Sequence, residues 1–223
     1  ACSALRELLR GRRTPPIHRV FSPIDQQEID RLATAPVDDP WFARGQLPVV
    51  LSVGRLVRTK DYPTLLRAFH RLLKRRDCRL VLLGEGRQRP KLEALISRLD
   101  LQESVALPGF VANPFAYMAR ADLFVLSSLF EGFGNVLAES LAVGTPCVAT
   151  DCKSGPAEIL DGGRYGALVP VGDIDALANA MDIALDSPPQ PERLREAVAR
   201  FDRTRVTADL LEVMRSVPAE RPG

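Results

Sequence analysis

Six short apolar runs, most of them ending in a loop rich in glycine and charge, constrain the fold of this chain more than any other feature. The runs are apolar throughout instead of alternating, and stretches with leucines at helical spacing separate them. Strands of this kind are buried on both faces, as in a parallel sheet covered by helices. The sequence therefore predicts an α/β fold, a doubly wound parallel six-stranded Rossmann-like sheet. The predicted strands are 47–54, 79–86, 104–109, 122–128, 146–150 and 166–170.

The remaining stretches predict how the chain is divided. Residues 26–187 are predicted to form the α/β domain, with its main helices at 62–76, 90–101 and 173–186. Residues 1–10 have helical spacing and 17–25 read as an extended link, while "SPPQP" interrupts the chain at 187–191. Two more amphipathic helices are predicted within 188–223.

Composition excludes several classes of function. The net charge of +2 gives no reason to expect nucleic acid as a partner, and the basic clusters "RELLRGRR" and "RLLKRR" read as solvated helix faces, with attraction to anionic lipid as the alternative. The four cysteines form no CxxC pair and the two histidines stand far apart, which argues against zinc and for a reducing cytoplasm. No apolar run reaches membrane-spanning length and no signal peptide is visible. The chain begins without methionine, so we expect a piece of something longer.

The stretch "EGFGNVLAES" contains the first candidate site residues. Gly132 and Gly134 disfavour a continuous helix, so a helix is predicted to begin near Asn135. The unpaired amides and positive end of such a helix suit a phosphate, and glycines let a ligand approach the backbone. Glu139 is then placed to hold the two hydroxyls of a ribose, and Glu131 to hold hydroxyls elsewhere on the same ligand. The alternative is structural: Asn135 as a helix cap and Glu139 as a complement to the helix dipole.

A second group of candidates follows the first predicted strand, in "GRLVRTKD". Arg55 and Lys60 lie five apart after the turn at Gly54, where two cations facing a helix N-terminus would clamp a diphosphate. The alternative is that both are ordinary surface charges. "LLGEG" supplies a tight turn at Gly84 and Gly86, but it is not GxGxxG, which counts against an NAD enzyme.

Together these segments resemble the retaining GT-B glycosyltransferases, most closely family 4 (glycosyltransferase group 1). The resemblance covers nearly the whole chain, and its most specific part is the pair Glu131 and Glu139 within "FEGFGNVLAESLAVGTPCVATD". "VGRLVRTKD", "LLGEG", "ALPGFV", "ADLFVLSS", "SGPAEIL" and "GALVPVGD" follow the family's order. Two departures are mild: Ser22 stands where the family usually has Asn, and "LSS" lacks a preceding proline.

The resemblance implies roles for individual residues. Arg55 and Lys60 would contact the diphosphate and Glu131 the donor sugar, which makes these three the expected catalytic residues; Glu139 would hold the ribose. Glu158 is a weaker candidate at the edge of the site. No metal is expected. The expected donor-binding residues are Gly54, Arg55, Lys60, Gly84, Gly109, Phe110, Val111, Glu131, Phe133, Gly134, Asn135, Val136, Leu137 and Glu139.

The implied activity is transfer of a sugar from a nucleoside-diphosphate sugar to an acceptor hydroxyl, with retention of configuration. The chain resembles the C-terminal, donor-binding half of such an enzyme and is expected to be inactive alone. Residues 1–25 resemble the last helix of the N-terminal domain and the linker, and 188–223 resemble helices that brace that domain.

The implied partners are a nucleotide sugar, with a UDP-sugar favoured over a GDP-sugar, a saccharide or lipid-linked acceptor, and the chain's own N-terminal domain. No cofactor and no nucleic acid are expected. The expected location is cytoplasmic, with peripheral contact at the inner membrane face. The alternatives are a non-catalytic nucleotide-sugar-binding module and a sugar-nucleotide epimerase; the base, sugar, acceptor, linkage and oligomeric state stay open.

Overall fold

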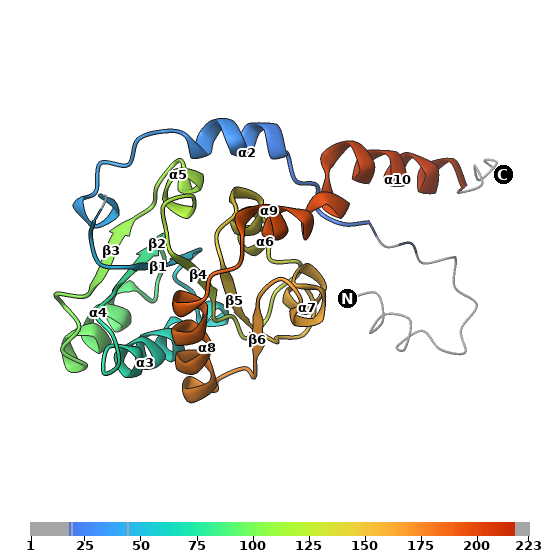
Figure 1. Cartoon of the computed structure of the whole chain (residues 1–223). Coiled ribbons are helices and arrows are strands. Elements are labelled where there is room, and N and C mark those ends of the chain that lie inside the picture. The colour runs from blue at the N-terminus through green and yellow to red at the C-terminus, as the bar shows by residue number, and fades with distance from the viewer. Residues whose placement is uncertain (1–17, 19, 44, 217–223) are drawn as a thin grey trace, which may run out of the picture.

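A computed structural model describes residues 18, 20–43 and 45–216 of the chain. Its centre is a six-stranded sheet in the order β3-β2-β1-β4-β5-β6, and every neighbouring pair is parallel (Figure 1). The order reverses between β1 and β4, so the predicted doubly wound sheet is confirmed. In such sheets a crevice opens at the reversal, beyond the carboxyl ends of the strands. The strands are β1 Val49–Val53, β2 Arg79–Leu83, β3 Val105–Gly109, β4 Leu123–Leu126, β5 Cys147–Thr150 and β6 Ala167–Val169.

Helices cover both faces of the sheet. Side chains of α3, α4 and α8 belong to one buried cluster, and those of α2, α5, α6, α7 and α9 belong to the other. The described part of the chain contains the α-helices α2 Gln26–Ala33, α3 Tyr62–Leu72, α4 Arg89–Arg98, α5 Pro114–Met118, α6 Asn135–Val143, α7 Pro156–Ile159, α8 Ile174–Asp186, α9 Pro191–Glu196 and α10 Arg203–Ser216. It also contains the short 3₁₀ helices η1 Pro40–Phe42, η2 Arg58–Lys60, η3 Asp161–Gly163 and η4 Ala199–Phe201.

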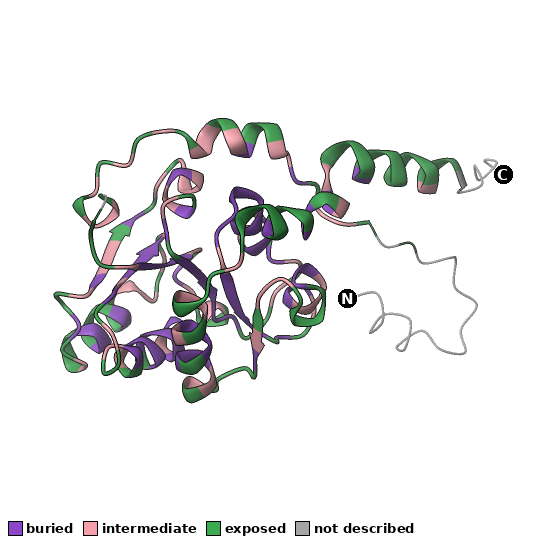
Figure 2. Ribbon diagram, in the orientation of Figure 1, coloured by how far each residue is buried: buried purple, intermediate pink, exposed green. Residues whose placement is uncertain are grey.

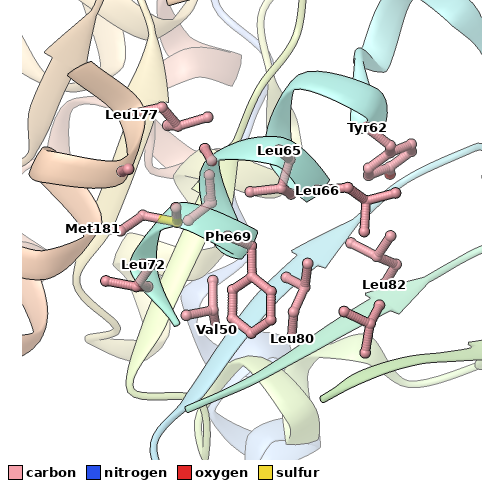
Figure 3. Packing of buried hydrophobic residues seen from close by; sticks show 14 of the residues in the cluster. Val50, Tyr62, Leu65, Leu66, Phe69, Leu72, Leu80, Leu82, Leu177 and Met181 are labelled. Atoms are coloured by element: carbon pink, nitrogen blue, oxygen red, sulfur yellow. The ribbon is translucent and has the colours of Figure 1, made fainter. Parts of the chain in front are cut away.

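The apolar runs became strands because neighbouring side chains along each strand enter opposite cores. Val50 packs in the cluster under α3, while the next residue, Leu51, packs in the other cluster. Figure 3 shows Phe69 of α3 lying between Val50 and Leu80 of the sheet. Val50 and Leu51 are both fully buried, although they point to opposite faces of the sheet. The strand therefore has no exposed face on which polar residues could alternate with apolar ones.

Two α-helices among the described residues were absent from the sequence prediction. Helix α2 is polar, buries only Ile29, and starts where the Asp25 carboxylate accepts a hydrogen bond from the Glu28 amide. Helix α7 is only four residues long and follows Gly155. The helix predicted for residues 1–10 lies outside the described residues. None of the described helices is both long and apolar enough to cross a membrane.

The C-terminal helices divide into two parts. Helix α9 packs against α6, and Leu194 and Phe201 are fully buried in the same cluster as α6. Helix α10 instead extends away from the sheet and is mostly exposed (Figures 1 and 2). Residues 191–201 thus complete the core of this unit, while the bracing role expected for 188–223 stays a prediction.

Candidate functional site

A cavity of about 490 Å³ lies beyond the carboxyl ends of β1, β2 and β3. It brings together five of the predicted site residues, which come from three separate loops: Gly54, Arg55, Gly84, Phe110 and Val111. We call this space the first cavity. The loops of its wall run from one strand end to the next, which is the position where doubly wound sheets bind ligands.

Glycine is required in this wall because two turns meet backbone to backbone. A Cβ on Gly84 would lie 2.1 Å from the carbonyl oxygen of Gly54, and φ of Gly84 is +137°. The amide of Gly84 donates to the carbonyl of Gly109 over 2.7 Å, so the third predicted glycine supports the same turn. Any larger residue at Gly84 would push the first two loops apart.

A second cavity, of about 580 Å³, lies at the start of α6. It is lined by Ser22, Lys60, Glu131, Gly132, Phe133, Gly134, Asn135 and Val136. The two cavities adjoin, since a Cβ on Gly54 would lie 3.1 Å from Cε of Lys60. Arg55, which is exposed, therefore lines the first cavity, and Lys60 stands between that cavity and the second.

The two predicted catalytic residues nearest the second cavity form an ion pair with each other. Nζ of Lys60 lies 2.7 Å from Oε1 of Glu131, and the side chains are only 18% and 12% exposed. Ser128 donates to the same carboxylate oxygen over 2.6 Å. Ser127 donates to the carbonyl of Lys60 over 2.8 Å, which fixes the end of η2 against the end of β4. The cation and the carboxylate are thus held in one orientation.

Sequence reasoning missed the serines that hold this pair. Besides Ser128, Ser154 donates from its hydroxyl to the carbonyl of Glu131 over 2.9 Å. Tyr62 was also missed; its hydroxyl donates to the carbonyl of Gly54 over 3.1 Å, and burial raises its pKa. A hydroxyl three residues before Glu131 was a visible signal for Ser128, whereas nothing in the sequence pointed to Ser154 or Tyr62.

Helix α6 begins at Asn135, as predicted. Its N-cap is Gly134 at φ +97°, so the alternative in which Asn135 caps the helix is wrong. The amide of Leu137 donates to the carbonyl of Gly134 over 2.9 Å and its side chain is fully buried. This engages an amide that was predicted to meet phosphate, and the roles of Asn135 and Val136 stay predictions.

Glu139 lies in the second turn of α6 and is half-buried. Burial raises the pKa of its carboxyl above the ordinary value of 4.5. Within the described part of the chain, no cation or hydrogen-bond donor pairs with this carboxylate, so its charge is desolvated without compensation. Glu158, the weaker candidate, lies in α7, where its carbonyl accepts a hydrogen bond from Arg200.

Metal ligands do not gather at the site. Over the described ranges, no three His, Cys, Asp or Glu side chains come close enough to hold an ion. The charged groups at the second cavity are instead one lysine and one glutamate, beside a helix N-terminus that carries a partial positive charge.

Residues 38–201 match the family model of "Glycosyl transferases group 1". A curated relative from Campylobacter jejuni, N-acetylgalactosamine-N,N'-diacetylbacillosaminyl-diphospho-undecaprenol 4-alpha-N-acetylgalactosaminyltransferase, is 42% identical over 159 residues, covering 71% of this chain and 42% of the relative. The lipopolysaccharide core biosynthesis glycosyltransferase LpsE of Rhizobium meliloti is 35% identical over 176 residues, 77% of this chain and 51% of LpsE. The chain thus spans about half the length of these relatives.

Solved structures share the fold. A glycosyltransferase from Rickettsia africae superposes with a TM-score of 0.82 at 19% identity, over 94% of this chain and 60% of the other. Anabaena Alr3699/HepE in complex with UDP-glucose superposes with a TM-score of 0.78 at 24% identity, over 96% of this chain and 62% of the other.

Proposed function

This chain belongs to the group 1 glycosyl transferases, and from that membership we propose that it is the donor-binding half of a sugar-transferring enzyme. The enzyme would move a sugar from a nucleoside-diphosphate sugar to an acceptor hydroxyl and retain the anomeric configuration. One observation carries the proposal: Lys60, Glu131 and the start of α6 line the second cavity, directly beside the first cavity with its glycine turns. A long ligand with an anionic centre fits two such adjoining spaces.

We place the base of the donor in the first cavity, beside Gly109, Phe110 and Val111. The ribose would meet Glu139, whose half-buried carboxylate has two acceptor oxygens and no cation of its own among the described residues. The donor sugar would meet Glu131 and the backbone of the loop 132–135. The places of the base and the sugar follow the adjacency of the two cavities, while Glu139 lines neither of them and lies one turn of α6 beyond Asn135.

The diphosphate would lie between the cavities, close to Lys60 and Arg55. Negative charge develops on it as it leaves, and two cations with the amides at the start of α6 would stabilise that charge. The acceptor hydroxyl would attack the anomeric carbon from the side of the leaving group while the bond from that carbon to the diphosphate breaks, and its proton would pass to the departing phosphate oxygen. This retains configuration without a protein nucleophile. Glu131 would then orient the donor sugar and hold the ammonium group of Lys60 in place.

The donor is proposed to be a UDP-sugar in preference to a GDP-sugar, because the Anabaena structure with a similar fold holds UDP-glucose. The acceptor is proposed to be a saccharide or a lipid-linked saccharide, since the Campylobacter relative is named for an undecaprenol-linked one. With such an acceptor the reaction would take place at the cytoplasmic face of a membrane, by peripheral contact.

The acceptor site is proposed to lie on a further domain that α10 and the segment before α2 would contact. The described residues provide no second domain to close over the donor. We therefore expect this chain to bind nucleotide weakly and to transfer little or no sugar by itself.

Calorimetric titration of the 223-residue chain with UDP, GDP and ADP tests the proposal. We expect saturable binding of UDP, lost in Glu139→Ala and kept in Glu103→Ala. Glu103 is a matched control, because it is exposed and precedes β3, at the end of that strand opposite to the first cavity. If no nucleotide binds to this chain or to a longer one with a second domain, the donor site is refuted.

A further inference from the structure

We infer that Phe21 and Phe201 are positioning residues, which fix the loop 131–134 and with it the start of α6. The three aromatic rings of Phe21, Phe133 and Phe201 contact one another, although they come from segments far apart in the chain. The inference deepens the proposed function and rests on it only where it says that this loop holds the donor.

The ring of Phe133 is packed against both other rings. Its centroid lies 5.1 Å from that of Phe201 at an interplanar angle of 85°, and 6.0 Å from that of Phe21 at 50°. Phe21 and Phe201 themselves lie 4.9 Å apart at 66°. Such tilted and edge-on pairs are favourable beyond the area they bury. Phe133 stands between Glu131 and Asn135, so its ring sets the position of the residues that line the second cavity.

The other side of the loop is held by the segment that contains Ser154 and Gly155. A Cβ on Gly155 would lie 2.1 Å from the carbonyl oxygen of Phe133, so the two backbones touch. The hydroxyl of Ser154 donates to the carbonyl of Glu131. The loop is therefore enclosed between the segment before α7 and the two phenylalanines, and removal of either ring takes away one of the two ring contacts on that side.

Phe21 and Phe201 belong to two segments that are joined to each other. The amide of Ile24 donates to the carbonyl of Phe201 over 2.7 Å, and the amide of Arg203 donates to the carbonyl of Ile24 over 3.0 Å. Arg203 also pairs with the Asp25 carboxylate. A displacement of this joined pair would move both rings together, and Phe133 with them.

The first test measures the loop without any nucleotide. The amides of Leu137 and Ala138 donate to the carbonyl of Gly134, so their hydrogen exchange reports opening at the start of α6. We expect exchange about two- to tenfold faster in Phe21→Leu and in Phe201→Leu, from the usual strength of an aromatic pair. Phe42→Leu is the matched control, since it removes another edge-on pair, with Tyr117 at 5.1 Å, from the same cluster.

A double-mutant cycle tests whether the ring of Phe21 acts on the start of α6 through the ring of Phe133. In a Phe133→Leu background, Phe21→Leu should no longer change the exchange of Leu137 and Ala138. Exchange that stays unchanged in both single variants, or that accelerates equally in Phe42→Leu, overturns the inference. So does an undiminished effect of Phe21→Leu when Phe133 is already leucine.

The second test concerns the ligand. UDP affinity, measured by calorimetry, should fall about two- to tenfold in Phe21→Leu and Phe201→Leu and stay unchanged in Phe42→Leu. Normal UDP affinity in a variant whose exchange is faster would overturn the role in donor binding. If the unaltered chain binds no nucleotide, the proposed function fails, while the exchange measurement still decides whether the rings hold the loop.

Discussion

The ammonium group of Lys60 lies 2.7 Å from the Glu131 carboxylate, although 71 residues separate them in the sequence. These two are the charged side chains that line the second cavity, and Ser128 donates to the same carboxylate oxygen. A phosphate that approaches Lys60 must therefore compete with Glu131. The pair couples the position of the cation to the position of the carboxylate.

This competition predicts that two substitutions differ in their effect on UDP binding. Lys60→Met should weaken UDP binding about 10- to 100-fold, the usual contribution of a hydrogen bond to a charged group. Glu131→Gln should leave UDP binding equal or stronger, because it releases Lys60. Calorimetry of the two variants checks this, with Lys74→Met, an exposed lysine after α3, as control. Equal losses in Lys60→Met and Lys74→Met would contradict it.

Glu139→Gln should stabilise the fold at pH 7 while it weakens UDP binding. Burial raises the pKa of Glu139 above 4.5, so the folded state disfavours its charged form. A raised folded pKa means stability that is fully present below pH 4.5 and lost as the pH rises through the raised value. The melting temperature of the variant should thus exceed that of the unaltered chain at pH 7, and the difference should close as the pH falls below 4.5.

The control for this pH dependence is Glu103→Gln, which replaces an exposed carboxylate. Its melting temperature should follow that of the unaltered chain at every pH. A melting temperature of Glu139→Gln below that of the unaltered chain at pH 7 would show that the carboxylate has a stabilising partner.

Gly155→Ala should destabilise the chain more than Gly172→Ala, although both glycines have positive φ, +92° and +77°. A methyl group at Gly172 meets nothing within 4 Å. The loss of stability there comes only from the positive φ of the backbone and is about 1–2 kcal/mol. At Gly155 the same methyl would overlap the carbonyl of Phe133, and we expect a total of about 3 kcal/mol or more. Urea unfolding of both variants measures the difference. Equal losses would refute the close contact.

Tyr62→Phe should lower the free energy of unfolding by about 1–3 kcal/mol, because the carbonyl of Gly54 loses its donor within the fold. Tyr62 is 2% exposed, so water cannot replace the hydroxyl there. Urea unfolding measures the change, and Tyr117→Phe serves as the control on a partly exposed ring. Losses of the same size in the two variants would contradict the role of the hydrogen bond.

The sheet and the start of α6 could be predicted because their signals are local. A run such as 79–83 is apolar enough to be buried on two faces, and Gly134 interrupts the helix directly before Asn135. Family motifs added roles to Arg55, Lys60 and Glu131, and the structure brings these residues to adjoining cavities. Their roles on a ligand stay predictions.

The contacts within the site could not be predicted, because they join residues far apart in sequence. Nothing near Lys60 indicates that it pairs with Glu131, and nothing near Phe21 indicates the ring of Phe201. Helix α2 was missed for a different reason: it is polar and buries one residue, so it offers no apolar run, and its packing on α5 and α6 marks it as part of the fold.

The bridge between Ile24 and Asp202 has a consequence for how this fold combines with others. The chain enters this unit at Ile24 and leaves it at Asp202, and these two residues are neighbours. The segment 24–202 is therefore connected to the rest of a polypeptide at one place. A unit attached in this way can be exchanged between polypeptides as one piece, without rerouting the chain of the recipient. Evolution could therefore vary what surrounds this unit while inheriting it whole.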